Sequence, residues 1–315
     1  MESILTLTVN PAIDKSCEIN HVVPERKLRC TKPSFEPGGG GLNVTRAIHK
    51  LGGKSEALYL SGGPPGQMLG HFLDEEGINH QPIEIEDWTR ENLVVFESTT
   101  EQQYRFGMPG PEIKAHEWQK VLDYIKNLST CPAFLVASGS LSTGIPVDFF
   151  TRVARIAKEK DIRMIVDTSG DALSSILEDG EIFLIKPNIG EFRDIAGKSE
   201  VTEEEQIIGY AGKLIKEKKV QVVVISIGSA GTLLVTKDGC RKMRAPAVTI
   251  KSKVGAGDSM VAGITLALAR GKALEDAIRF GIAAGAGAVM TPGTELCRRE
   301  DVERLYERMK AEVIS

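Results

Sequence analysis

The chain has 315 residues, 42% hydrophobic and 26% charged, and a formal net charge of −4 at pH 7. This composition is ordinary for a globular enzyme, and the acidic balance argues against a nucleic-acid partner because no face is obviously basic. The five cysteines are scattered and form no C-x-x-C motif, so we expect free thiols. The N-terminus lacks the basic start of a signal peptide, and no apolar run reaches the roughly 18 residues of a membrane span. We therefore expect a cytoplasmic protein.

Apolar runs that stop at polar or glycine turns predict buried strands. They lie at 4–9, 55–63, 133–141, 163–170, 182–188 and 220–228. Helical patterns alternate with them, at 43–53, 66–78, 146–159, 171–178, 202–217, 257–269 and 273–289. This alternation predicts an α/β fold in which a mostly parallel sheet is covered by helices on both faces.

Two stretches interrupt the alternation. Residues 15–37 and 89–107 each resemble a pair of short strands joined by a polar turn, with no helix between the members. We expect them to form a small β-sheet outside a main domain, which would comprise 1–14, 38–88 and 108–315.

The segment VGAGDSM, residues 254–260, leads directly into a long apolar helical pattern. The first N–H groups of a helix attract anions, and Asp258 would lie in that first turn as a candidate general base. The alternative is an ordinary helix start, where Asp is also favoured.

Two further motifs end buried strands. In KPNIGEF, Asn188 and Glu191 are spaced to face one way on a helical turn, where they could hold Mg²⁺ through water. The same pair satisfies a capping box, so both interpretations stay open. SIGSAG, residues 226–231, offers the flexible backbone that a phosphate or a purine requires, or a tight turn.

Two motifs near the N-terminus suggest a ligand site. Four consecutive glycines precede a helix in PGGGGLNV, residues 37–44, and their entropic cost favours a ligand lying against the bare backbone. Asp14 follows the first strand, where open α/β sheets bind ligands, and it could accept hydrogen bonds from two sugar hydroxyls or cap a turn.

Four cations lie in the two excursions: Lys27 and Arg29 in the first, Arg90 and Arg105 in the second. In an acidic protein they indicate an anionic group on the substrate. The alternative is a solvated charged face.

In their order and spacing, GGGGLNVTRAIHKLGG, KPNIGEF, SIGSAG and VGAGDS resemble the ribokinase/PfkB family of sugar kinases over nearly the whole chain. Within this family KLRC, FEPGGGGLNV, DWTREN, QYRFGMPG and TELC are most similar to the minor bacterial type of 6-phosphofructokinase. The unbroken glycine run, Gly38 to Gly41, favours fructose 6-phosphate, because the kinases of fructose 1-phosphate and tagatose 6-phosphate usually carry a lysine there.

The resemblance implies a ribokinase-like three-layer α/β/α sandwich with a β lid that pairs in a homodimer. It implies transfer of a phosphoryl group from ATP, with Mg²⁺ and K⁺, to the C1 hydroxyl of fructose 6-phosphate. For catalysis it implies Asp258 as base and the amides of Gly255, Ala256 and Gly257 as an anion hole. For ATP and magnesium it implies Lys186, Asn188, Glu191, Ser226, Gly228 and Gly231.

The sugar phosphate would be held by Asp14, Gly39, Gly40, Asn43, Arg90, Arg105 and Ser140, with Lys27 reaching it from the partner subunit. Backbone carbonyls near Ser252, Val254, Ala288, Thr291 and Gly293 would hold potassium. The alternatives are a tagatose-6-phosphate kinase or a 1-phosphofructokinase on the same scaffold, and, outside enzymes, a sugar-phosphate sensor without turnover. The intact Asp258 speaks against the sensor, which needs no base.

Overall fold

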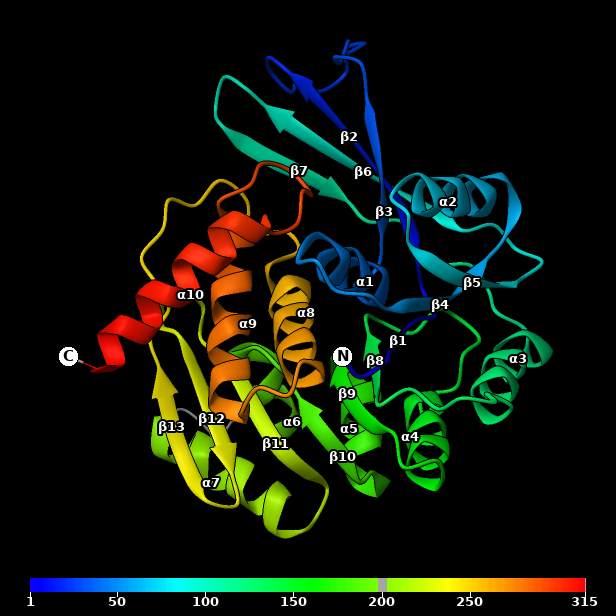
Figure 1. The fold of residues 1–315 in the computed structure, drawn as a ribbon. Helices are drawn as coiled ribbons and strands as arrows, with labels where there is room; N and C mark the ends of the chain where they lie inside the picture. The colour runs from blue at the N-terminus through cyan, green and yellow to red at the C-terminus, as the bar shows by residue number, and fades with distance from the viewer. Residues whose placement is uncertain (198–202, 315) are drawn as a thin grey trace.

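A central β-sheet between two layers of helices, with a second and smaller sheet at one end, makes up the fold (Figure 1). The computed structural model describes residues 1–197 and 203–314. The predicted α/β/α sandwich with an additional small sheet is therefore confirmed. No helix within the described ranges is long and apolar enough to cross a membrane.

The main sheet has nine strands in the order β13-β12-β11-β10-β9-β8-β1-β4-β5. Their bounds are β1 Ile4–Thr8, β4 Glu56–Ser61, β5 Asn79–Glu84, β8 Phe134–Ser138, β9 Arg163–Asp167, β10 Ile182–Ile185, β11 Val220–Ser226, β12 Thr232–Thr236 and β13 Gly239–Met243. The strands from β5 to β11 run parallel, and β12 and β13 add an antiparallel edge. The carboxyl ends of the parallel strands therefore open onto one edge, where such sheets bind ligands.

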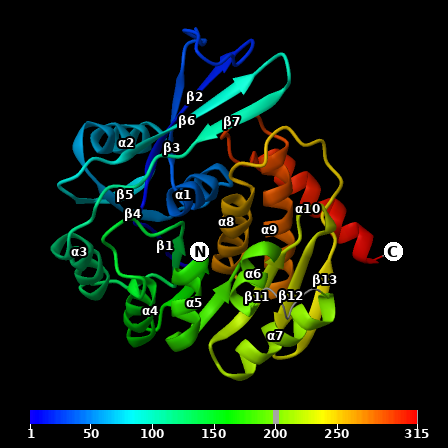
Figure 2. The ribbon, with the colours of Figure 1, turned by 180° about the vertical axis from the view of Figure 1, so that it is seen from behind.

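Helices cover both faces of this sheet, as the two views in Figures 1 and 2 show. Their bounds are α1 Gly40–Lys50, α2 Gly63–Glu75, α3 Ala115–Lys126, α4 Phe149–Glu159, α5 Gly170–Asp179, α6 Ile189–Ala196, α7 Glu204–Lys216, α8 Ala256–Ala269, α9 Leu274–Val289 and α10 Arg299–Ile314. Helices α3 to α7 pack with one set of strand side chains, and α1, α8, α9 and α10 pack with the alternate set. The alternation of side chains along each strand thus divides the core into two apolar layers.

The second sheet has four strands in the order β3-β2-β6-β7. Their bounds are β2 Ala12–Ile19, β3 Ser34–Gly38, β6 Arg90–Glu97 and β7 Gln102–Phe106. The strands β2 and β6 run parallel, and each forms an antiparallel pair with its own neighbour. Both predicted excursions therefore contribute to one sheet, which projects beyond α1 and α2 (Figure 1).

Some elements differ from the sequence predictions. The helix expected at 43–53 begins earlier, at Gly40, and the helix expected at 66–78 begins at Gly63. The sequence prediction did not include α3, β5, β12, β13 or α10. Residue 202, the predicted start of another helix, lies outside the described residues, and that helix is seen from Glu204.

The glycine run has a packing role that the sequence argument did not foresee. A Cβ atom on Gly40 would lie 2.7 Å from the amide nitrogen of Gly139, and one on Gly41 would lie 2.5 Å from the carbonyl oxygen of Leu7. Gly39 has a φ of 110°, which side chains rarely adopt. The run therefore has a packing reason in addition to the ligand that the sequence favours, because α1 begins in contact with the strand ends.

Candidate active site

The predicted catalytic carboxylate lies at the carboxyl edge of the main sheet. Asp258 is in the first turn of α8, and the side-chain amide of Asn43 on α1 donates to its Oδ2 at 2.9 Å. Burial and the nearby Asp167 carboxylate raise the pKa of Asp258 to about 6, against the opposing effects of the Asn43 hydrogen bond and the Lys186 ammonium. A carboxylate with a pKa near neutrality is suited to accept a proton.

A buried ion pair adjoins Asp258. The Nζ of Lys186, directly after β10, lies 3.1 Å from Oδ1 of Asp167, and the side chains are 5% and 14% exposed. Burial disfavours the Lys186 ammonium, but the carboxylates of Asp167, Glu191 and Asp258 raise its pKa above the ordinary value. A permanent positive charge is thus held beside the candidate base.

Sequence reasoning missed Asp167. In the sequence it is only a polar residue at the end of the strand predicted at 163–170. Its importance depends on β9 lying next to β10, which aligns Val166 with Ile185 and brings Asp167 near Lys186. The available signal was its place at a strand end, where ligands of parallel sheets bind.

The N-terminus of α8 has the geometry of an anion site. Gly255 caps the helix in the left-handed region, with a φ of 72°, and a Cβ atom there would lie 2.6 Å from Cδ2 of Leu296. A Cβ atom on Gly257 would be 3.6 Å from the Nζ of Lys186, so the ammonium lies close to the helix start. The first N–H groups of a helix have no intrahelical partner and carry partial positive charge. Together with Lys186 they can stabilise negative charge beside Asp258.

Asn188 and Glu191 form the capping box that the sequence left as one alternative. The backbone N–H of Asn188 donates to Oε2 of Glu191 at 2.8 Å, and that of Glu191 donates to Oδ1 of Asn188 at 2.9 Å. Asn188 also bridges to Ser226, which ends β11. Gly228 lies in the next turn with a φ of 56°, and a Cβ atom on Gly231 would collide with the carbonyl oxygen of Met243. The structure therefore brings these residues together, and the lack of space for a side chain explains why position 231 is a glycine.

Arg90, Asn10 and Ser140 form a second polar group. Arg90 is half-buried, and its Nη1 and Nη2 donate to the carbonyl oxygens of Met108 at 3.1 Å and Asn10 at 3.2 Å. The side-chain amide of Asn10 donates to Oγ of Ser140 at 3.1 Å. The buried Nε of Arg90 and Oδ1 of Asn10 have no hydrogen-bond partner among the described residues. Burial lowers the pKa of Arg90, with Asp14 opposing.

The four-stranded sheet presents several predicted substrate residues on one face. Asp14 is in register with Asn92, and Val94 with Arg105. Because side chains alternate along a strand, Asp14, Arg90 and Arg105 project from the same side. Lys27 lies exposed between β2 and β3, outside this group.

The segments predicted to hold potassium contact one another. The Oγ of Ser252 donates to the carbonyl oxygen of Gly293 at 2.7 Å, and Oγ1 of Thr291 donates to that of Ala288 at 2.7 Å. The N–H of Val254 donates to Oγ of Ser252 at 3.2 Å. Each carbonyl oxygen keeps a second lone pair, so the donor set is compatible with a hard cation.

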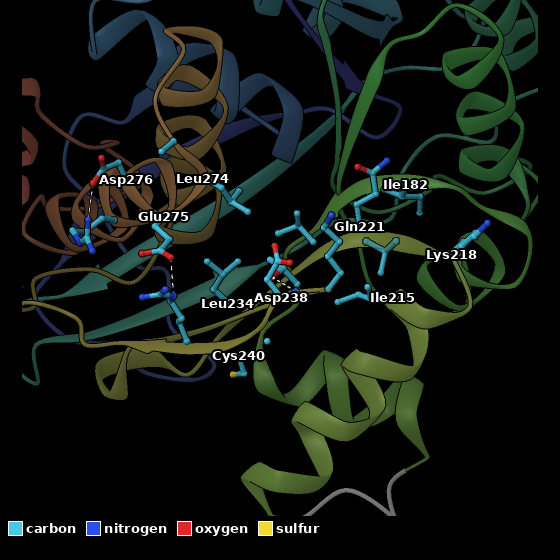
Figure 3. A pocket seen from close by; sticks show the side chains of 18 of the residues that line it. Ile182, Ile215, Lys218, Gln221, Leu234, Asp238, Cys240, Leu274, Glu275 and Asp276 are labelled. Carbon is cyan, nitrogen blue, oxygen red and sulfur yellow. Dashed lines mark hydrogen bonds and ion pairs between the residues drawn. The ribbon is translucent and has the colours of Figure 1, made fainter.

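A cavity of about 1280 Å³ lies away from these residues, and Figure 3 shows side chains that line it. It lies at the opposite edge of the sheet, where β10 and β11 begin, and its lining includes Glu181, Val220 and Leu274. The charged side chains in its wall are largely paired, as Arg241 is with Glu275 at 2.7 Å. We place the chemistry at Asp258 because the titratable groups converge there.

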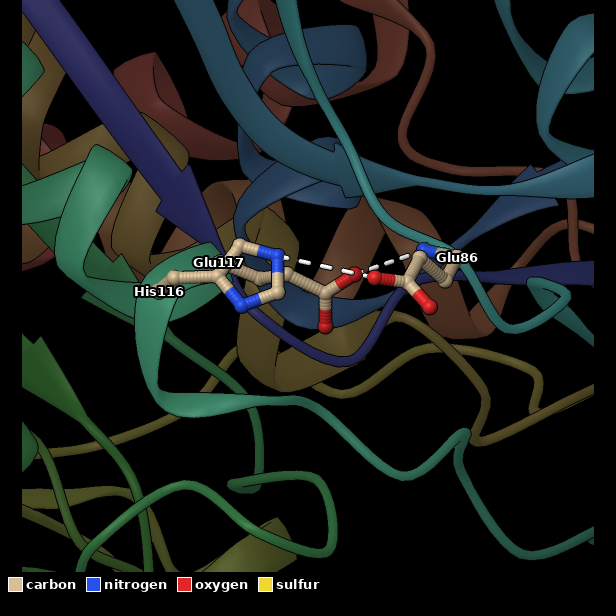
Figure 4. Close-up of side chains that lie close together, drawn as sticks. All are labelled: Glu86, His116 and Glu117. Carbon is tan, nitrogen blue, oxygen red and sulfur yellow. Dashed lines mark hydrogen bonds and ion pairs between the residues drawn. The ribbon is translucent and has the colours of Figure 1, made fainter.

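A group of possible metal ligands, Glu86, His116 and Glu117, also lies outside the site (Figure 4). The buried Glu117 accepts backbone N–H groups of Glu86 at 2.6 Å and Lys114 at 2.7 Å. The Glu86 carboxylate is paired with the Lys114 ammonium. These contacts cap the start of α3 and account for the cluster.

Comparison with known proteins places this geometry in a family. Residues 7–301 match the profile of the pfkB family carbohydrate kinases. The chain is 43% identical to "ATP-dependent 6-phosphofructokinase isozyme 2" of Mycobacterium tuberculosis over 96% of this chain and 89% of the relative. It is 32% identical to a "1-phosphofructokinase" of Borreliella burgdorferi over 99% of each chain.

Two crystal structures of phosphofructokinase-2 from Escherichia coli, each 39% identical in sequence, are closely similar. The structure described as a complex with potassium has a TM-score of 0.94 and covers 98% of this chain and 100% of its own. The structure described as a complex with fructose-6-phosphate has a TM-score of 0.92 with the same coverage.

Proposed function

The chain belongs to the pfkB family of carbohydrate kinases, and we propose that it transfers the γ-phosphoryl group of ATP to the C1 hydroxyl of fructose 6-phosphate. The product is fructose 1,6-bisphosphate. The substrate choice is supported by 43% identity to a 6-phosphofructokinase, against 32% to a 1-phosphofructokinase.

One observation carries the proposed chemistry. Asp258, at the start of α8, accepts a hydrogen bond from Asn43 on α1 and lies beside the buried Lys186. Asp258 accepts the proton of the attacking sugar hydroxyl. The amides of Gly255, Ala256 and Gly257, together with Lys186, face the charge that develops on the transferred group. Phosphoryl transfer depends mainly on positioning and charge stabilisation, which these groups supply.

On the nucleotide side we assign Lys186, Asn188, Glu191, Ser226, Gly228 and Gly231 to ATP. Mg²⁺ would neutralise phosphate charge when bound. Asn188 and Glu191 are compatible with it because they are oxygen donors, and the capping box engages only Oε2 of Glu191 by a backbone N–H. Asn188 and Glu191 would hold hydrated Mg²⁺ through water.

Glu191 variants can separate the magnesium role from the capping role. We expect Glu191→Ala and Glu191→Gln both to raise the magnesium concentration needed for half-maximal activity, because both remove a negative charge. Glutamine preserves the capping box, since its amide oxygen also accepts the Asn188 N–H. Magnesium titrations at saturating substrates measure the effect.

The matched control is Glu117→Gln, which changes the equivalent capping residue of α3 away from the site. We expect its magnesium titration to overlay that of the wild type. If the magnesium titration of Glu191→Gln also overlays that of the wild type while the titration of Glu191→Ala does not, Glu191 acts only as a helix cap.

We assign potassium to the carbonyls of the 252–254 and 288–293 segments. Their support is the contact between Ser252 and Gly293 beside the chain that leads into α8. A cation there would hold the anion-hole residues in place. Activity in potassium chloride should exceed activity in tetramethylammonium chloride of equal ionic strength, and equal rates would exclude the assignment.

We propose that 15–37 and 89–107 act as a lid and pair with those of a second copy. Phe35 and Phe106, which project from the face of this sheet opposite to Asp14 and Arg90, are 36% and 47% exposed, and a small isolated sheet is marginal in water. Pairing would bury these rings and place Lys27 near the neighbouring cleft.

We expect sedimentation to show a dimer at assay concentration and Phe106→Glu to shift it to monomer with loss of activity, because a charge would enter the apolar contact. Val147→Glu, at a residue that is 49% exposed and lies outside the small sheet, is the control. A fully active wild-type monomer would exclude the lid as an obligatory contact.

The reaction itself is tested by coupled ADP release with four acceptors: fructose 6-phosphate, tagatose 6-phosphate, fructose 1-phosphate and fructose. We expect fructose 6-phosphate to give the highest kcat/KM. A higher value for fructose 1-phosphate or tagatose 6-phosphate would assign one of those kinases instead. Binding without ADP release would identify a sensor.

A further inference from the structure

The Asp14 carboxylate is held by a side chain that lies 78 positions away in the sequence. The amide Nδ2 of Asn92, on β6, donates to Oδ1 of Asp14, on β2, at 2.8 Å. The parallel register of the two strands places these residues directly opposite each other. Both side chains are half-buried, so the hydrogen bond is partly shielded from water.

The other oxygen of Asp14 is also confined. A Cβ atom on Gly38, at the end of β3, would lie 2.5 Å from Oδ2 of Asp14. The carboxylate therefore occupies the space between the bare backbone of Gly38 and the amide of Asn92. With one side closed by backbone, the Asn92 hydrogen bond selects the rotamer of Asp14.

Asn92 also contacts the segment that leaves the small sheet. Its Oδ1 accepts the backbone N–H of Met108 at 3.1 Å. The carbonyl oxygen of the same Met108 accepts from Nη1 of Arg90 at 3.1 Å. The backbone of Met108 thus contacts both the Asn92 side chain, which orients Asp14, and the Arg90 guanidinium. The contact to the Met108 N–H requires the Asn92 oxygen to face that way, which directs its NH₂ group toward Asp14.

We infer that Asn92 is a positioning residue. It orients the Asp14 carboxylate toward the sugar hydroxyls and holds it at a fixed position relative to the Arg90 guanidinium. This inference rests on the proposed function, in which Asp14 and Arg90 hold the two ends of a phosphosugar. Asn92 acts through Asp14, so its removal affects sugar binding before it affects phosphoryl transfer.

Two substitutions test this role. Asn92→Ala removes the donor and should raise KM for the sugar phosphate about tenfold. This factor corresponds to the lower end of the range of free energies that a hydrogen bond to a charged group contributes. Asn92→Asp keeps the shape but sets a second carboxylate against Asp14. Two carboxylates at this distance do not both ionise readily, so acid should relieve the repulsion. The ratio of Asn92→Asp KM to wild-type KM should therefore fall as the pH is lowered from about 7 to about 5, the direction in which such a pair takes up one proton, while the Asn92→Ala ratio stays constant.

Asn79→Ala is the matched control, because Asn79 is an exposed asparagine on β5, outside the small sheet. We expect its KM to equal that of the wild type, and KM for ATP to change less than about twofold in every variant. Thermal unfolding midpoints check that the sheet remains folded. A ratio for Asn92→Asp that does not vary with pH, or unchanged KM in both variants, would overturn the inference.

The four-acceptor assay with the wild type separates this result from the proposed function. If the wild type prefers another phosphosugar, the assignment to fructose 6-phosphate fails, and the same KM ratios are measured with the preferred sugar. If the wild type prefers fructose 6-phosphate but neither Asn92 variant changes KM for this sugar, only the role of Asn92 fails.

Discussion

Asp258→Asn should lower kcat by about 10²–10⁴-fold, the contribution of a positioned general base, while KM for the sugar phosphate changes little. Asparagine has almost the same shape and keeps the first turn of α8. It cannot accept the hydroxyl proton. Steady-state kinetics with fructose 6-phosphate and ATP measure both parameters, and a kcat within about threefold of the wild type would remove Asp258 from this role.

Asp276→Asn is a matched control, because Asp276 occupies the equivalent position in the first turn of α9 and its side chain is 44% exposed. Asp276 is paired with Arg279 away from the candidate site. We expect this variant to keep wild-type kcat. A similar loss in both variants would indicate that a helix-start aspartate matters for folding and not for chemistry.

The pH dependence follows from the raised pKa of Asp258, about 6. The base must be ionised to accept a proton, so wild-type kcat/KM, which reports the groups of the free enzyme, should be constant above about pH 7 and fall tenfold per pH unit well below pH 6. The residual activity of Asp258→Asn should lack this inflection. A wild-type profile with no inflection between pH 5 and 7 would show that another group limits the reaction.

The same pKa shift predicts a change in stability with a definite sign. Because the folded pKa is above the ordinary value of 3.8, the folded protein binds this proton more tightly than the unfolded chain does. The contribution of Asp258 to stability is therefore most favourable below about pH 4 and is lost as pH rises through 6. Asp258→Asn should be more stable at pH 8, by up to about 3 kcal/mol in the free energy of unfolding, and this advantage should shrink toward pH 4.

Arg90→Ala should raise KM for fructose 6-phosphate about ten- to a hundredfold and leave KM for ATP nearly unchanged. This range corresponds to the loss of one charge-assisted hydrogen bond, about 1.5–3 kcal/mol. Two nitrogens of the guanidinium are already held by the Met108 and Asn10 carbonyls, and the buried Nε has no partner among the described residues. The group is therefore oriented in advance and has a donor left for a phosphate.

Arg90→Lys keeps the charge but loses the planar fork, so it should recover only part of the binding. Arg155→Ala serves as the control, because this arginine of α4 is paired with Asp179 and its side chain is 61% exposed. If KM for ATP rises as much as KM for the sugar, Arg90 does not act on the sugar phosphate. If unphosphorylated fructose shows equal kcat/KM, the cations of the small sheet are a solvated surface.

Local patterns in the sequence were sufficient for the layer architecture. Buried parallel strands are continuous apolar runs such as 220–228, and the helices between them follow a different period. The segment 254–260 likewise indicated a helix start with a carboxylate in its first turn, which is where Asp258 lies. These features depend on residues near one another in the chain, so a single sequence displays them.

Some omissions were failures of interpretation, since the signal was present. Val302, Leu305, Tyr306 and Met309 follow the spacing of one helix face and are buried on α10. Lys237 and Asp238 form the turn between β12 and β13, and Gly directly after Asp at the start of β13 gives the Asp-Gly pair that is a common hairpin signal. Neither α10 nor the β12–β13 hairpin was predicted, although each pattern involves residues that are close together in the sequence.

Only the tertiary structure decided which side chains meet. Asn43 contacts Asp258 across 215 positions, and Asn92 contacts Asp14 across 78. These contacts depend on the order of strands in each sheet and on the register between them, which apolar periodicity does not specify. The same holds for Asp167 beside Lys186 and for the glycines that let α1 approach β1 and β8. The sequence by itself determined the elements and the residue types available for chemistry, while packing determined their distances, their burial and the raised pKa of Asp258, because those quantities arise from neighbours that are remote along the chain.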